Sequence, residues 1–414
     1  MECTILSIGT ELSLGLVQDT NSHFIADKLA HIGIECNYMH IVRDNVEEIS
    51  RILNLSLELS DVIIVNGGLG PTDDDVTRQA IARSLGLELV RDESLDAASL
   101  KYIRKIKTDE VRERLLRQSY VPKGAISFKP RIGSASGFAI NYREKWIFSI
   151  PGVPREMSDM LEGNVIPMIS EIIGSSEDRN IKKLVLMTTD ISETEIEGRI
   201  KDLMPEAREQ GIRVGITANP GFIKVILVGS DRGGKYIEDM AAKMKDRIGL
   251  NVYGFNDTRI GYHLKKVIEQ KGRLITISTA ESITGGLIGS MITDIDGSSA
   301  YYAGGVVAYS NDAKIRILQV DKDLIAKKGA VSSEVCIQMA KSSMKIFGSS
   351  YGVAVTGYAG PEGKEVGLVY CAIYGPGDKH SVSERKFIGT REDIKFRTAQ
   401  YALNQLRIRV LEDE

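Results

Sequence analysis

Residues 3–70 alternate short apolar runs with segments of helical spacing, and this pattern restricts the fold more than any other feature. Residues 3–8, 35–42 and 61–70 are predicted strands, and residues 21–33 and 45–60 are predicted helices between them. Strands that alternate with helices at short intervals pair in parallel, because each helix carries the chain back across the sheet. The pattern predicts an α/β fold with a mainly parallel sheet covered on both faces, extending to about residue 172.

Two polar, glycine-containing stretches divide the rest of the chain. Residues 173–180 and 251–257 are interpreted as linkers. The segment between them predicts a small α+β domain, and after the second linker strands and helices alternate again. A chain of 414 residues is long enough for each part to have its own core. We therefore expect three domains, at residues 1–172, 173–254 and 255–414.

Composition and charge argue against several classes of partner. The chain has 53 Lys and Arg against 56 Asp and Glu, so it lacks a basic footprint for nucleic acid. No apolar run reaches the length that spans a membrane, and the N-terminus lacks a signal-peptide pattern. The 4 cysteines are scattered, which argues against a disulfide framework or a zinc knuckle. We expect a cytoplasmic protein with neither nucleic acid nor membrane as partner.

The strongest motif of the first domain is VNGGLGPTDDD at residues 65–75. A buried strand ends there, three glycines follow, and a helix is predicted to start after Pro71. Such a turn lets backbone N–H groups approach a phosphate closely. Residues 73–75 are all aspartates and would repel phosphate unless a divalent cation such as Mg²⁺ lay between them. The alternative is that these aspartates only cap the helix and match its dipole.

Other polar residues are expected at the same edge of the sheet. Glu11 follows the first strand, Asp44 follows the second, and residues 149–157 form a glycine–proline turn that leads into a helix. Sites in α/β sheets gather at the carboxyl ends of the strands. The alternative is that Glu11 and Asp44 are solvated turn residues without a role in a site.

The segments GTELSLG, DTN, GGLGPTDDD and PGVPREM together resemble the N-terminal domain of the competence/damage-inducible protein CinA family. The resemblance implies a molybdopterin-binding-like fold and a metal-dependent ADP-ribose pyrophosphatase that yields AMP and ribose 5-phosphate. The alternative is a molybdopterin- or nucleotide-binding module without hydrolysis. The predicted nucleotide- or phosphate-binding residues are Gly67, Gly68, Gly70, Thr72 and Gly152, and the predicted metal ligands are Glu11, Asp44, Asp73 and Asp74.

The middle domain resembles the KH-like insert of the same family. A KH module that binds nucleic acid needs a GxxG loop between its helices, whereas the glycine pair of DRGGKY precedes the final helix. We interpret this domain as a spacer or dimerisation element that does not bind RNA.

The third domain contains two stretches that suggest a site. Residues 279–286, TAESITGG, lead from a predicted strand into a helix, which suits a phosphate or a ribose, although an ordinary helix cap explains them as well. In residues 296–314, a strand that returns beside the GSS turn could bring Tyr309 and Lys314 back to Ser299. Serine needs a base, and a partly desolvated lysine can serve as one. The alternative is that Lys314 is a solvated residue of an amphipathic helix.

TAESITGG, DGSSAYY, YSNDAK, GAVSSE, AVTGYAGP and F-x-G-x-R together resemble the C-terminal CinA domain, the nicotinamide mononucleotide amidase (PncC) family. The resemblance implies that Ser299 is the nucleophile and that Tyr309 and Lys314 assist it. Arg397 matches an arginine that we assign to the substrate phosphate or the active centre. The predicted amidase pocket comprises Ser282, Thr284, Gly285, Gly286, Thr356 and Arg397.

The implied reaction needs no metal. Lys314 takes the proton of Ser299, and the alkoxide attacks the carboxamide carbon of nicotinamide mononucleotide. Ammonia leaves, and water then releases nicotinic acid mononucleotide. The sequence departs from the family at Ile283, at Tyr358 and at the short loop of residues 360–367, which bears on substrate affinity.

We therefore expect a bifunctional hydrolase of pyridine-nucleotide salvage. Its substrates would be nicotinamide mononucleotide and ADP-ribose, with a divalent cation at the N-terminal site only, and it would form a homodimer. One alternative is a non-catalytic nucleotide- or molybdopterin-binding protein that acts in competence or the DNA-damage response. Another is an enzyme in which only the amidase is active.

Overall fold

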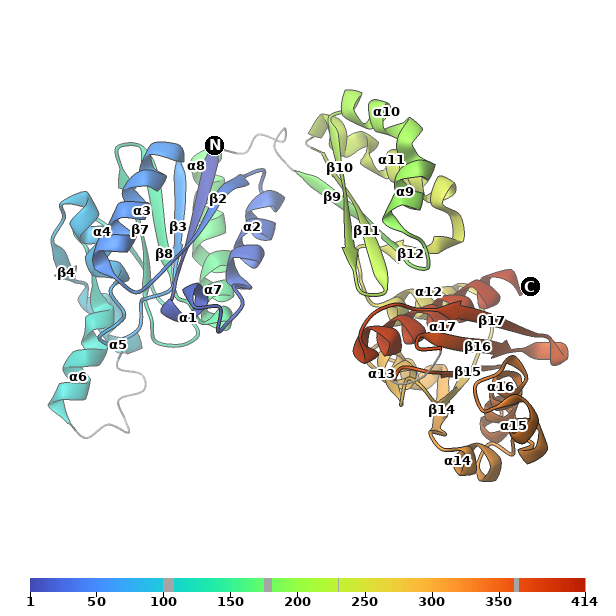
Figure 1. The fold of residues 1–414 in the computed structure, drawn as a ribbon. Coiled ribbons are helices and arrows are strands. Elements are labelled where there is room, and N and C mark those ends of the chain that lie inside the picture. Colours follow the sequence, from blue (N-terminus) through green and yellow to red (C-terminus); the bar gives the residue numbers. More distant parts are fainter. Residues whose placement is uncertain (100–107, 175–180, 230, 361–364, 414) are drawn as a thin grey trace. The chain divides into compact units, whose positions relative to one another are not determined.

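The computed structural model describes residues 1–99, 108–174, 181–229, 231–360 and 365–413 (Figure 1). The chain divides into two compact units, Met1–Lys182 and Lys183–Glu414. The linker expected at residues 173–180 lies mostly outside the described residues.

The first unit is built on a six-stranded sheet. Its strand order is β2-β1-β3-β8-β7-β6, and the first four strands are parallel while β7 and β6 are antiparallel additions. The strands are β1 (Glu2–Ile8), β2 (Glu35–Val42), β3 (Val62–Asn66), β6 (Ile126–Phe128), β7 (Gly137–Tyr142) and β8 (Lys145–Ile150), with a separate pair β4 (Leu89–Arg91) and β5 (Tyr120–Pro122).

Both faces of this sheet are buried, because successive side chains of a strand point to opposite sides. In β3, Ile63 and Val65 belong to one apolar cluster, whereas Val62 and Ile64 belong to another. Helices α3 and α4 cover the first face, and α2, α7 and α8 cover the second (Figure 1). The helices are α1 (Thr10–Ser13), α2 (Asn21–His31), α3 (Val46–Leu59), α4 (Thr77–Leu85), α5 (Asp96–Ser99), α6 (Asp109–Leu116), α7 (Pro154–Met160) and α8 (Ile166–Ile173).

The second unit begins with a four-stranded sheet of order β10-β11-β9-β12. Its elements are β9 (Lys182–Thr188), α9 (Glu193–Ile200), α10 (Met204–Glu209), β10 (Ile212–Asn219), β11 (Phe222–Gly229), α11 (Asp231–Ile248) and β12 (Val252–Phe255). The linker interpretation of residues 251–257 is wrong over β12, which pairs antiparallel with β9. Val252 and Tyr253 are buried there, so this segment belongs to the sheet core.

The remaining residues form a five-stranded sheet of order β14-β13-β15-β16-β17, parallel over the first three strands and antiparallel over the rest. Helices α12, α13 and α17 share a core with one face and α16 with the other. The elements are α12 (Ile260–Gln270), β13 (Ile277–Glu281), α13 (Leu287–Thr293), β14 (Tyr302–Val307), α14 (Asn311–Arg316), α15 (Lys322–Lys328), α16 (Ser333–Phe347), β15 (Tyr351–Gly357), β16 (Leu368–Tyr374), β17 (His380–Lys386) and α17 (Arg391–Glu412).

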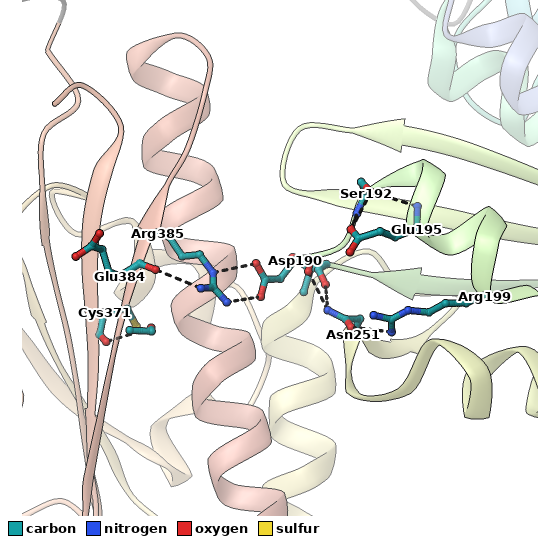
Figure 2. Close-up of polar contacts among 10 residues, drawn as sticks. Asp190, Ser192, Glu195, Arg199, Asn251, Cys371, Glu384 and Arg385 are labelled. Atoms are coloured by element: carbon teal, nitrogen blue, oxygen red, sulfur yellow. Dashed lines mark hydrogen bonds and ion pairs between the residues drawn. The ribbon is translucent and has the colours of Figure 1, made fainter. Parts of the chain in front are cut away.

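The two sheets of this unit share one core. In β9, Leu186 faces the middle-domain helices, whereas Val185 and Met187 pack in the cluster that contains α12 and α17. Polar contacts add to the junction. The guanidinium of Arg385 on β17 pairs with the carboxylate of Asp190 at 3.2 Å, and the side chain of Asn251 donates to the Asp190 carbonyl (Figure 2). The predicted α/β fold class is confirmed.

Candidate functional sites

A cavity of 520 Å³ lies in the first unit, at the carboxyl ends of β1, β3 and β8. The turns that follow β1, β2, β3 and β8 supply most of its lining, as expected for a parallel sheet. Gly67, Gly68 and Gly70 all line it, together with Gly152 from the turn after β8. A Cβ added to Gly67 would lie 2.4 Å from the carbonyl oxygen of Ile8, so only glycine fits there.

The lining of this cavity is acidic. The described residues of the lining include six carboxylates and no lysine, arginine or histidine. A phosphate would be repelled by these charges unless a cation lay between them. The carboxylates belong to Glu11, Asp19, Asp44, Asp74, Asp75 and Glu156.

Three of the four predicted metal ligands line the cavity, and Asp73 does not. The Asp73 carboxylate instead pairs with the guanidinium of Arg117 at 2.6 Å. Among the described residues, no group of three or more carboxylates, cysteines or histidines forms a ready metal cluster. Mg²⁺ in nucleotide sites commonly uses one or two carboxylates plus water and substrate phosphates. One or two of the carboxylates of Glu11, Asp44 and Asp74, which line the cavity, fit that kind of site.

The glycine turn differs from the sequence prediction in one respect. Helix α4 begins at Thr77 rather than after Pro71, so residues 73–75 are neither its cap nor its first turn. The Asp75 carboxylate accepts hydrogen bonds from the N–H groups of Gly70 and Thr72, which closes a loop. The hydroxyl of Thr72 contacts the carboxylates of Asp74 and Asp75, and Thr72 is not part of the cavity lining.

Sequence reasoning missed several residues that shape this site. Asn21, from the DTN motif, donates to the Gly152 carbonyl at 2.7 Å and so ties two turns together. Burial alone would raise the pKa of Asp19, but hydrogen bonds from the hydroxyl and N–H of Ser22 outweigh it and lower this pKa. Burial raises the pKa of Glu156. The DTN and PGVPREM motifs carry these residues, so their chemistry was visible but their place in the cavity was not.

The second site centres on Lys314, at the carboxyl ends of β13 and β14. Its side chain is only 2% exposed, although the residue sits on the short helix α14. The amine donates to the hydroxyl of Ser282 at 2.9 Å, and to the carbonyls of Ala308 at 2.9 Å and Tyr309 at 3.4 Å. Burial lowers the pKa of Lys314. No carboxylate pairs with this amine among the described residues, so it is poised to lose its charge.

The turn after β13 is closed by a buried carboxylate. Glu281 is 1% exposed, and its two oxygens accept from the hydroxyl of Thr284 and from the N–H groups of Gly286, Ile288 and Gly289. These are the groups at the start of α13 that the sequence offered to a substrate phosphate. An internal acid therefore caps this helix, and it occupies the Thr284 hydroxyl and the Gly286 N–H, two of the donors assigned to a phosphate from the sequence.

Thr356 lies beside Ser282, because β15 pairs with β13 up to Glu281 and the Ser282 N–H donates to the Val355 carbonyl. Its hydroxyl donates to the carbonyl of Ala330 at 2.9 Å. Tyr309 is 62% exposed, and its hydroxyl accepts a hydrogen bond from Arg391 at 2.8 Å. Arg391 is the last residue of the F-x-G-x-R motif, so a signal for it was present in the sequence.

Ser299 does not join these residues within the chain. It lies exposed on a short 3₁₀ turn, Ser298–Ala300, just before β14. The carbonyl of Tyr301 accepts from Ile277, the first residue of β13, whereas Ser282 follows the last. The returning strand therefore carries Tyr309 and Lys314 away from Ser299, and the expected juxtaposition is absent.

Arg397 lies in another cavity, of 450 Å³, between the middle domain and α17. That cavity is also lined by Asp190, Arg385 and Tyr401, and by none of Ser282, Lys314 and Thr356. The Arg397 Nε is buried without a hydrogen-bond partner. Of the short loop at residues 360–367, residues 361–364 lie outside the described residues.

Two families and many relatives match the sequence. The family described as probable molybdopterin binding domain matches residues 4–171, and the CinA C-terminal domain family matches residues 262–410. A putative competence-damage inducible protein of Halothermothrix orenii is 37% identical over 414 residues, covering 98% of either chain. One of Bacillus subtilis is 35% identical over 423 residues, covering 99% of this chain and 98% of the relative. A CinA-like protein of Geobacter sulfurreducens is 37% identical over 424 residues, covering 99% and 100%.

Among the described residues, no helix is both long and apolar enough to cross a bilayer.

Proposed function

This chain belongs to the family of competence-damage inducible (CinA) proteins, and from that premise we propose that its C-terminal domain hydrolyses the carboxamide of nicotinamide mononucleotide. The buried, unpaired amine of Lys314 beside Ser282 carries the proposal. A solvated lysine would remain charged at neutral pH, whereas a desolvated one can accept a proton. A module that only binds nucleotides has no need of a buried amine without a carboxylate partner.

In the proposed reaction Ser282 is the nucleophile and Lys314 the base, because the Lys314 amine lies 2.9 Å from the Ser282 hydroxyl, whereas Ser299 lies exposed at the far end of β14. The serine proton passes to the neutral amine as the oxygen attacks the carboxamide carbon. The C–N bond breaks, and ammonia leaves with a proton returned by the lysine. Water then cleaves the acyl ester to give nicotinic acid mononucleotide. The Ala308 carbonyl positions the Lys314 amine, and Tyr309 with Arg391 forms the exposed rim of the site.

The test is ammonia release from nicotinamide mononucleotide in the presence of EDTA, with Lys314→Met and Lys322→Met compared. Methionine keeps the length of the buried side chain, and Lys322 is an exposed lysine that serves as matched control. We expect release by the wild type and by Lys322→Met, and a loss of at least about a thousandfold in Lys314→Met, the scale of removing one member of a catalytic pair. Wild-type activity in a folded Lys314→Met variant would refute the role of the lysine.

A second function is favoured by the acidic cavity of the first unit. We propose that this cavity cleaves the diphosphate of ADP-ribose with a divalent cation. One or two of the carboxylates of Glu11, Asp44 and Asp74 would hold the cation, which neutralises the diphosphate when bound. Within the glycine turn the N–H group of Gly68 would orient a phosphate, because those of Gly67 and Gly70 already donate to the Ile150 carbonyl and the Asp75 carboxylate. Glu156, whose pKa is raised by burial, is suited to take a proton from the attacking water.

The measurement is AMP formation from ADP-ribose with and without Mg²⁺. Metal-dependent AMP formation that falls in Asp44→Asn supports the proposal. If ADP-ribose binds by calorimetry but no AMP forms at any Mg²⁺ concentration, the domain is the non-catalytic binding module. AMP formation that persists in EDTA would refute the assignment of the carboxylates to a cation.

A further inference from the structure

Two of the four cysteines lie side by side in the sheet of the first unit. Cys3 on β1 and Cys36 on β2 are direct partners in the parallel register, so their side chains point to the same face of the sheet. Cys3 belongs to the apolar cluster of that face, and Cys36 packs against it. Neighbouring strands lie about 4.8 Å apart, and a disulfide joins Cα atoms that are about 4.4–6.8 Å apart. The backbone therefore holds this pair at a distance that a disulfide can span.

The two thiols differ in exposure and in acidity. Cys3 is fully buried, whereas Cys36 lies on the edge strand of the sheet and is partly exposed. Hydrogen bonds from the Cys3 thiol and from the backbone near Tyr38 lower the pKa of Cys36, although burial opposes them. The hydrogen bond with Cys36 and burial raise the pKa of Cys3. Cys36 is therefore the thiol that more readily forms a thiolate, which is the form that reacts with oxidants.

The other two cysteines lie in the opposite kind of environment. Cys336 on α16 and Cys371 on β16 are buried, and burial raises the pKa of both thiols, that of Cys371 to about 12. Their side chains belong to different apolar clusters, on opposite faces of the C-terminal sheet. Thiols that stay protonated and out of reach of solvent are inert. The reactive thiol of this chain is thus expected at Cys36, with Cys3 as its neighbour.

We propose that Cys36 and Cys3 form a site of reversible oxidation, in which Cys36 reacts with hydrogen peroxide and Cys3 then closes a disulfide. An accessible thiolate beside a second thiol is the arrangement typical of redox sensors. The Cys36 thiolate attacks one peroxide oxygen, the O–O bond breaks, and the leaving hydroxide takes up a proton to become water. The Cys3 sulfur then attacks the sulfenic acid of Cys36, the S–O bond breaks, and a second water carries away the Cys3 proton. The two thiols lose two electrons, and peroxide is reduced to two waters.

The position of the pair in the sheet agrees with this role. The register shifts by one residue directly after the pair, at Asn37, and such a bulge lets the edge strand bend locally. An exposed edge also gives thiol reductants access, and exposed disulfides are among those most easily reduced. The pair lies near the amino ends of β1 and β2, whereas the acidic cavity lies at the carboxyl ends of the sheet. Oxidation would therefore modify the first unit without consuming a residue of either proposed site.

Treatment of the full chain with hydrogen peroxide tests the inference. The chain is then unfolded, its remaining thiols are alkylated, and its peptides are mapped by mass spectrometry without reductant. We expect two of the four thiols to be lost, with Cys3 and Cys36 in linked peptides that dithiothreitol separates. Cys336 and Cys371 are the internal control and should be fully alkylated. Loss of these two thiols at the same rate, or oxidation of Cys36 without a link to Cys3, would overturn the inference.

Single substitutions separate the two roles. In Cys36→Ser all remaining thiols should survive peroxide, because buried Cys3 is not attacked directly. In Cys3→Ala, which keeps a small apolar side chain in the core, Cys36 should accumulate as a sulfenic acid that dimedone traps. Rapid loss of the Cys3 thiol in Cys36→Ser, or a folded Cys3→Ala chain without dimedone adduct, would overturn Cys36 as the attacking thiol. Because Cys36→Ser changes a partly exposed residue, it decides the question even if the core variant does not fold.

Discussion

The buried carboxylate of Glu281 offers the sharpest stability prediction. It accepts hydrogen bonds from three N–H groups at the start of α13 and from the Thr284 hydroxyl. In Glu281→Gln, the amide oxygen can keep one set of these donors, but the amide NH₂ then faces the N–H of Gly289. One buried donor left without an acceptor costs about 1–3 kcal/mol. The hydrogen bonds from Thr284, Gly286 and Ile288 are also weakened, because their acceptor is no longer charged. We expect a total destabilisation of about 3–5 kcal/mol.

The assay is thermal unfolding of the full chain by calorimetry, following the transition of the second unit. For a unit of this size each kcal/mol lowers Tm by roughly 2–4 °C, so Glu281→Gln should lower it by roughly 10 °C. Glu269→Gln is the matched control, because Glu269 is 60% exposed and pairs with Lys265 at 3.6 Å. That change should cost about 0.5 kcal/mol or less. Equal Tm values for the two variants would refute the view that Glu281 holds the helix start.

Three further predictions concern the sites. Burial lowers the pKa of Lys314 below 10.5, the ordinary value for lysine, and only the neutral amine can accept a proton. The value of kcat/KM for the amide should therefore rise with pH as this amine loses its proton. A flat pH profile would contradict this role of Lys314. Arg391→Ala removes the hydrogen bond to the Tyr309 hydroxyl and should lower kcat/KM roughly fivefold. Arg397→Ala should leave kcat/KM unchanged, because Arg397 lines a different cavity. Equal losses in the two variants would show that Arg397 does act in the amidase site. Asp44→Asn should weaken Mg²⁺ binding in calorimetry and Asp73→Asn should not; the opposite order would move the metal site.

The regular elements could be predicted because burial imposes a period on the sequence. In β3 every residue is buried, with Ile63 and Val65 on one face and Val62 and Ile64 on the other, so a continuous apolar run marks the strand. The prediction of a linker at residues 251–257 was wrong because two buried residues, Val252 and Tyr253, are enough to hold β12 in the sheet although the segment looks polar. Short strands leave too weak a periodic signal to detect.

Local motifs located the sites better than they described them. The glycine turn at residues 67–70 lines its cavity as predicted, but no sequence rule shows that Asp75 folds back on Gly70 and delays α4 to Thr77. Glu281 stands in a motif that looks ready for a phosphate, and only the structure shows that it accepts the donors itself. The same sequence pattern at the start of a helix is expected whether its N–H groups donate to a capping side chain or to a bound anion.

The pairing of Ser299 with Lys314 failed for a geometric reason. Residues 300–313 separate them in the sequence and include the whole of β14, so the distance between the two side chains depends on the direction of that strand. Because β14 pairs in parallel with β13, residues before β14 lie at the amino end of β13 and residues after β14 lie at its carboxyl end. The strand's direction was implicit in the α/β pattern, and applying it would have separated the two residues before the structure was known.

The most direct test of the account is ammonia release from nicotinamide mononucleotide, without added metal, by the wild type and by Ser282→Ala. The account predicts stoichiometric ammonia and nicotinic acid mononucleotide from the wild type, and neither from the folded variant. Equal release by both would show that Ser282 is not the nucleophile, with Ser299 as the next residue to substitute. No release by the wild type would contradict the amidase altogether.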